Sequence, residues 1–154
     1  MLAVFPDMRF VWTHRDPLRA VDSVVNMYGH CMWVRSDTPF VPGVLDMVMS
    51  PELAAQMLMQ PVRWMEDGIL PRDQVCNLLY DDLIARPLDS IRRIYDSFGM
   101  PLDDGAIAGM RRYLDAHPRD ARPAAQYART DDAAGGDRAA FAAYQAHFNV
   151  PSEP

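Results

Sequence analysis

The sequence predicts an α/β fold in which a partial parallel sheet is flanked by helices. Two short apolar stretches, 8–13 and 75–80, are typical of strands, and helical patterns lie between and after them. In the first stretch Phe10, Val11 and Trp12 are consecutive, which favours a strand covered on both faces. Because a typical sheet has about five or six strands, we expect the other strands of this sheet to lie elsewhere.

The first strand is followed at once by a predicted helix over 17–34. Asp16 is a good N-cap, and Pro17 suits the first helical position. The apolar residues of this range recur at steps of three and four: Leu18, Val21, Val25, Tyr28 and Met32. This spacing predicts one apolar face.

Residues 36–50 contain two prolines and a glycine and are predicted to be a loop. Ser50 and Pro51 begin a second predicted helix that runs to about residue 67. Pro61 is expected to kink or interrupt this helix, because proline removes a backbone hydrogen bond.

After the second strand, Pro87 begins a predicted helix that ends at Gly99, and 103–116 forms another. Residues 118–138 are rich in Pro, Gly, Ala, Asp and Arg, which indicates a loose polar segment. A last short helix carries aromatic residues at helical spacing: Phe141, Tyr144 and Phe148. By length, 1–150 is predicted to be a single domain.

Composition excludes several classes of protein. Hydrophobic residues make up 49%, enough for a packed core, and the net charge of −6 argues against broad nucleic-acid or anionic-membrane binding. Cys31 and Cys76 lack metal-ligand spacing, so we expect two buried free thiols and no metal. No run of about 18 apolar residues and no signal-peptide pattern is present, which predicts a cytoplasmic protein.

Arg15 lies where the first strand hands over to a helix, the usual position of ligands in open α/β sheets. Free N–H groups of the helix start and the guanidinium fork both favour a phosphate there. Ser23 follows Asp16 by seven residues, nearly two turns, and so shares its face. In the alternative reading Arg15 pairs with a nearby carboxylate such as Asp16 or Asp22, and Ser23 is a solvated helix residue.

The stretch FPDMRFVWTHRDPLRAVDSVVNMY resembles the 3′-phosphate-binding segment of sulfotransferases that use PAPS, 3′-phosphoadenosine 5′-phosphosulfate. In that family an arginine ends a strand and a serine follows eight residues later. Both bind the 3′-phosphate. The resemblance therefore implies this role for Arg15 and Ser23, and it looks closest to the bacterial branch.

A second stretch, VCNLLYDDLIARPLDSIRRIYDSFGMPL, resembles a later strand, turn and helix of the same family. The resemblance places Tyr80 near the adenine, whereas a tyrosine at a strand end is more commonly a core-edge residue. The resemblance covers roughly 3–150. It implies the carboxyl-terminal part of a P-loop-NTPase-like sulfotransferase fold.

The sequence departs from the family pattern in three places. It has no amino-terminal phosphate loop for the 5′-phosphosulfate, no lysine, and no residue that can be assigned as the catalytic base. His14 adjoins Arg15, but neighbours on a strand point to opposite faces. The family's late Arg-Lys-Gly segment is replaced by scattered arginines, of which one substitutes for it or all are solvated: Arg119, Arg122, Arg129 and Arg138.

The resemblance implies transfer of a sulfuryl group from PAPS to a hydroxyl or amine, with PAP, the desulfated nucleotide, as product. The expected partners are the nucleotide and a small-molecule acceptor whose pocket includes loop 36–50. The alternative is a truncated, non-catalytic domain that binds PAP or a partner chain. An open sheet edge favours self-association or a completing chain.

Overall fold

The computed structural model describes residues 2–37, 50–119 and 134–153. The chain divides into two compact units, of which the first, the sheet unit, comprises Met1–His14 and Asp67–Ala125. The second, the helical unit, comprises Arg15–Glu66 and Gln126–Pro154. Most of the predicted loop 36–50 and of the loose segment 118–138 lies outside the described residues. The single domain expected for 1–150 stays a prediction.

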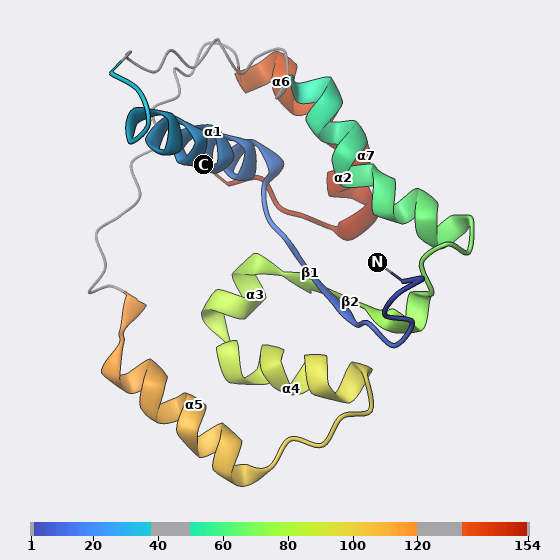
Figure 1. Cartoon of the computed structure of the whole chain (residues 1–154), viewed down its shortest axis with the longest axis vertical. Helices are drawn as coiled ribbons and strands as arrows, with labels where there is room; N and C mark the ends of the chain where they lie inside the picture. Colours follow the sequence, from blue (N-terminus) through green and yellow to red (C-terminus); the bar gives the residue numbers. More distant parts are fainter. Residues whose placement is uncertain (1, 38–49, 120–133, 154) are drawn as a thin grey trace. The chain divides into compact units, whose positions relative to one another are not determined.

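The sheet unit contains two parallel strands, β1 (Phe10–His14) and β2 (Val75–Leu79). Their register pairs Phe10 with Val75 and His14 with Leu79. A short 3-10 turn precedes β2, and three helices follow it: α3 (Tyr80–Ala85), α4 (Pro87–Ser97) and α5 (Asp104–Ala116). Figure 1 shows α3 and α4 following the strands within this unit. The predicted α/β class with a small parallel sheet is confirmed.

Burial within the two strands alternates. In β2 Cys76 and Leu78 are buried, with Leu78 only 1% exposed, and their neighbours are half-buried. In β1 Val11 is 46% exposed. The expectation that β1 is covered on both faces is therefore wrong within the described residues, because consecutive apolar side chains on a strand still point to opposite sides.

The helical unit is held by a small apolar core. Its helices are α1 (Pro17–Trp33), α2 (Pro51–Glu66), α6 (Ala134–Ala140) and α7 (Ala142–Phe148). Helix α2 lies against both α6 and α7 (Figure 1). Leu18, Ala54 and Phe141 form the buried cluster that joins them. Helix α6 begins inside the predicted loose segment, and Phe141, which directly follows it, is buried in this core.

Helix α2 continues through Pro61, contrary to the expected interruption. Proline removes one backbone donor, at a cost of about 3 kcal/mol in a helix interior. Val62 and Met65, just beyond it, are both buried. Burial of these side chains offsets the lost hydrogen bond and keeps the last turn helical.

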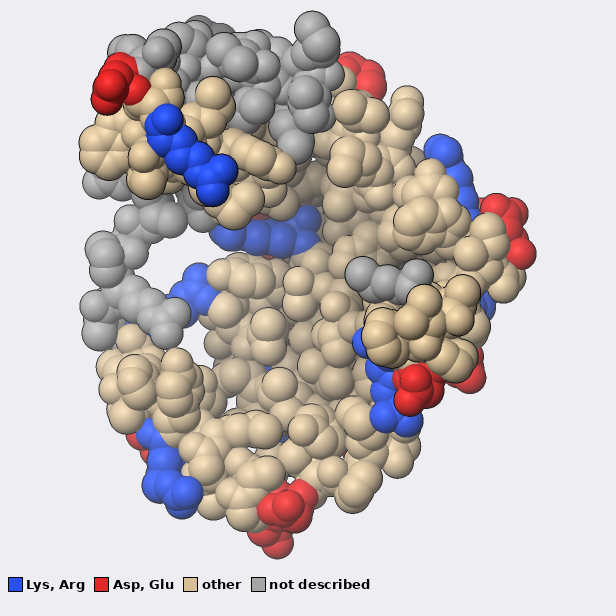
Figure 2. Space-filling view, in the orientation of Figure 1, with Lys and Arg blue, Asp and Glu red and all other residues tan. Residues whose placement is uncertain are grey.

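The two cysteines differ in exposure. Cys76 is buried in β2 as expected, whereas Cys31 is exposed, so the prediction of two buried thiols is wrong for Cys31. Cys31 lies in the last turns of α1, where Met32 and Trp33 are also exposed. Figure 2 shows basic and acidic side chains interspersed over the described part of the face in view. This mixture agrees with the acidic total charge.

Candidate functional site

Arg15 and Asp16 form the whole link between β1 and α1. The strand ends at His14 and the helix begins at Pro17. Asp16 caps the helix as predicted, because its Oδ1 accepts the Leu18 backbone N–H at 3.0 Å. Pro17 has no N–H to satisfy at the first helical position. Local chemistry therefore places Arg15 directly before the first turn of α1.

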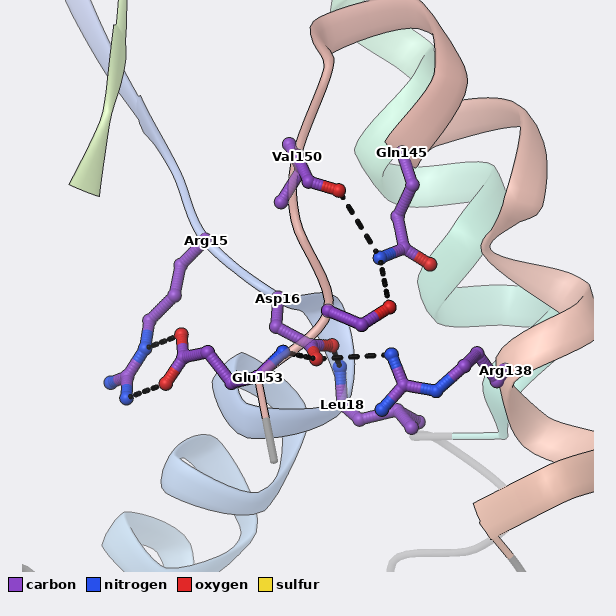
Figure 3. A network of polar contacts seen from close by, with 8 residues as sticks. Arg15, Asp16, Leu18, Arg138, Gln145, Val150 and Glu153 are labelled. Atoms are coloured by element: carbon purple, nitrogen blue, oxygen red, sulfur yellow. Dashed lines mark hydrogen bonds and ion pairs between the residues drawn. The ribbon is translucent and has the colours of Figure 1, made fainter. Parts of the chain in front are cut away.

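Arg15 holds a carboxylate through both sides of its guanidinium group (Figure 3). Its Nε donates to Oε1 of Glu153 at 2.7 Å, and its Nη2 donates to Oε2 at 2.7 Å. The two side chains are only 24% and 23% exposed. A forked, partly shielded pair of this kind is the geometry by which arginine recognises carboxylates and phosphates.

Asp16 connects three segments of the helical unit (Figure 3). Its Oδ2 accepts a hydrogen bond from Nη1 of Arg138 at 3.0 Å and another from the Glu153 backbone N–H at 2.7 Å. The residue is 1% exposed. A carboxylate buried to this degree is tolerated when it is paired and fully hydrogen-bonded.

The carboxyl-terminal segment is led to Arg15 by a defined turn. Asn149 adopts the left-handed conformation, with φ 53°, and ends α7. The Gln145 side-chain amide donates to the Val150 carbonyl oxygen at 3.3 Å and to the Ser152 hydroxyl at 3.2 Å. Val150 is buried, so it anchors the segment just before Glu153.

The surroundings of Glu153 lower the pKa of its carboxyl group below the ordinary value of 4.5. The hydrogen bonds from Arg15 are the largest cause, and the positive charges of Arg15 and Arg19 act in the same direction. Partial burial and the negative charge of Asp16 oppose them. The ion pair is therefore formed at neutral pH.

Acidification is expected to release Glu153 from Arg15. Because the folded pKa is depressed, the stabilisation is complete above the ordinary carboxyl value and is lost as the pH falls through the lowered one. Carbon NMR of the Glu153 carboxyl should give a midpoint below 4.5, and Arg15→Ala should return it towards that value. A midpoint that Arg15→Ala leaves unchanged contradicts this origin of the shift.

Ser23 lies on α1, seven residues beyond the cap, and is half-buried. Its side chain makes no hydrogen bond within the part of the chain that the structure describes. Asp22, which the alternative reading paired with Arg15, is a neighbour of Ser23 on the same helix. The printed partner of Arg15 is instead Glu153, so that reading was right about a carboxylate and wrong about which one. Joint binding of a phosphate by Arg15 and Ser23 stays a prediction.

Tyr80 belongs to the sheet unit, where it is the first residue of α3, directly after β2. The Arg119 Nη2 donates to the Tyr80 hydroxyl at 3.2 Å, and its guanidinium carbon lies 5.7 Å from the ring centroid. A late arginine thus contacts the residue that the resemblance places near the adenine. A shared nucleotide site of Tyr80 with Arg15 stays a prediction.

The other residues named from the sequence are accounted for as follows. His14 is buried and lies 2.9 Å from Oδ1 of Asn77 through its Nε2, as part of the sheet unit. Arg138 pairs with Asp16, whereas Arg122 and Arg129 lie outside the described residues. Sequence reasoning missed Glu153 altogether, because no motif surrounds it.

Two searches for other kinds of site found nothing within the described ranges. No group of three or more His, Cys, Asp or Glu side chains there is arranged to hold a metal ion. None of the described helices combines the length and apolarity that crossing a bilayer requires.

Comparisons with known proteins agree on one family. A family model described as "Sulfotransferase family" matches residues 1–104. Among solved structures, the sulfotransferase STF9 from Mycobacterium avium is similar, with 29% sequence identity and a TM-score of 0.66. The match covers 99% of this chain and 39% of that one, so the chain spans well under half the length of this relative. No curated protein matches.

Proposed function

Because the chain belongs to the sulfotransferase family, we propose that it supplies the 3′-phosphate and adenine side of a PAPS donor site. In the whole reaction a sulfuryl group passes from PAPS to a hydroxyl or amine of a small-molecule acceptor. Arg15 and Ser23 hold the 3′-phosphate in this proposal, and Tyr80 lies beside the adenine. The cytoplasmic location and the sheet-edge partner expected from the sequence belong to the proposal as well.

One observation carries the proposal: Arg15 already grips an oxyanion. The Glu153 carboxylate presents two oxygens to the guanidinium fork at 2.7 Å each. A phosphate presents oxygens at similar spacing with more negative charge, and it binds the same donors. The position of this fork, one residue before an aspartate-capped helix start, also favours an anion through the helix dipole.

The residues around Arg15 fit the task of orienting a bound phosphate. Asp16 is fixed by three hydrogen bonds, so the backbone that carries Arg15 is held at the helix start. PAPS, when bound, supplies the activated sulfuryl group. The contribution of these residues is to bind and orient the nucleotide, which lowers the entropic cost of reaching a reactive geometry.

A non-catalytic binding domain is the second candidate, and two observations favour it. The chain spans 39% of the solved relative, and its sequence contains neither a phosphate loop nor an assignable base. Those groups supply the main electrostatic and proton-transfer contributions to catalysis. PAP release from PAPS, measured on the purified chain with a panel of phenols and amines, separates the two. Turnover supports the enzyme, whereas PAP binding without turnover supports the binding domain.

Replacing Arg15 by alanine is expected to weaken PAP binding by about 1–3 kcal/mol, roughly 5- to 150-fold in Kd. The loss follows from removing a charge-assisted forked contact. Isothermal calorimetry on the purified chain measures it. Arg63→Ala is the matched control, because Arg63 is an exposed arginine on α2 of the same unit. Equal affinities for Arg15→Ala and the unmodified chain would end the assignment of Arg15.

A further inference from the structure

The carboxyl-terminal segment lies on the residue that the proposed function assigns to phosphate binding. We propose that residues 150–153, here called the C-terminal latch, compete within the chain for the oxyanion position on Arg15. The latch closes when Glu153 pairs with Arg15, and it opens when a phosphate takes the same donors. This inference rests on the proposed function for the identity of the phosphate, and it adds a means of regulating the site.

Competition follows from the geometry of the pair. Glu153 uses both Nε and Nη2 of Arg15, which is the edge of the guanidinium that a phosphate would use in a forked contact. Two anions on one edge repel each other strongly in a partly shielded position. A 3′-phosphate held by this edge and a docked Glu153 are therefore mutually exclusive.

The latch can open without disturbing the fold of the helical unit. Val150 is buried and stays as the anchor, whereas Pro151 and Ser152 are exposed and Glu153 is only half-buried. When Glu153 leaves, Asp16 loses one of its three printed hydrogen bonds. It keeps the Leu18 N–H that caps α1 and the Arg138 guanidinium that neutralises its charge. Only the last few residues need to move.

The size of the effect depends on how often the latch is closed. Apparent affinity falls in proportion to the fraction of molecules whose site is available. A latch closed in about 70–90% of molecules lowers the affinity for the phosphate roughly three- to tenfold. Neutralising Glu153 should restore that factor.

The first experiment compares Kd for PAP between the unmodified chain, Glu153→Gln and Glu66→Gln. Glu66 is an exposed glutamate at the end of α2, so its variant removes the same charge from the same unit away from Arg15. Glu153→Gln is expected to bind PAP about three- to tenfold more tightly, and Glu66→Gln is expected to match the unmodified chain. Equal tightening by both variants would reduce the effect to net charge and overturn the latch.

The second experiment watches the latch directly through the Glu153 amide in nitrogen–proton NMR spectra. This N–H donates to buried Asp16 when the latch is closed. Titration with PAP, and separately with inorganic phosphate, should move its signal to a solvent-exposed position, while sodium chloride at equal ionic strength should not. Displacement by inorganic phosphate alone supports the latch and removes PAP as the ligand. If neither anion moves the signal, or if PAP binds while Glu153 stays docked, the latch is wrong.

Discussion

Replacing Phe141 by alanine is expected to lower the free energy of unfolding of the helical unit by about 3–5 kcal/mol. Phe141 is 1% exposed and belongs to the cluster with Leu18 and Ala54. Alanine there removes the transfer free energy of the ring and leaves a cavity where helices α1, α2 and α6 meet. Urea unfolding followed by circular dichroism measures the loss as a shift of the midpoint.

Phe148 provides the control for this variant. It is the same residue type, lies at the end of α7 and is only half-buried. Phe148→Ala should therefore cost clearly less than Phe141→Ala. A loss below about 1 kcal/mol for Phe141→Ala would contradict the packing described for this core.

Replacing Asp16 by alanine is expected to destabilise the helical unit by about 2–4 kcal/mol. The change removes the cap of α1, the acceptor of the Arg138 guanidinium and the acceptor of the Glu153 N–H. The cost also includes an Arg138 side chain, 35% exposed, that is left without its carboxylate. Urea unfolding measures this loss too.

Asp16→Asn separates the contribution of the cap from that of the charge. Asparagine is as good an N-cap as aspartate, so the Leu18 N–H keeps an acceptor. The negative charge opposite Arg138 is lost, and we expect an intermediate loss of stability. If Asp16→Ala is as stable as the unmodified chain, Asp16 does not organise the three segments as described.

The parts of the fold that sequence could predict are those set by local chemistry. The start of α1 follows from an aspartate whose side chain reaches an N–H two residues on and from a proline that needs no donor. Helix α4 likewise begins at Pro87 and lies within the predicted range, which Gly99, at φ 61°, was expected to close. Both signals act within one turn, so no tertiary contact is needed to read them.

The parts that sequence missed depend on distant contacts. Pro61 does not interrupt α2, because residues beyond it are buried. Glu153 pairs with a residue 138 positions away, and its surrounding sequence of Pro, Ser and Pro carries no motif. The preference of Arg15 for an oxyanion could be read from its position, but the carboxylate that it holds could not.

The claim on which the account depends is that Arg15 reads the 3′-phosphate of the nucleotide. Calorimetry of PAP and of AMP, which lacks that phosphate, on the unmodified chain and on Arg15→Ala tests it as a double cycle. The account predicts that the unmodified chain prefers PAP and that Arg15→Ala loses most of this preference. If Arg15→Ala keeps the full preference for PAP over AMP, the 3′-phosphate is bound elsewhere and the account is contradicted.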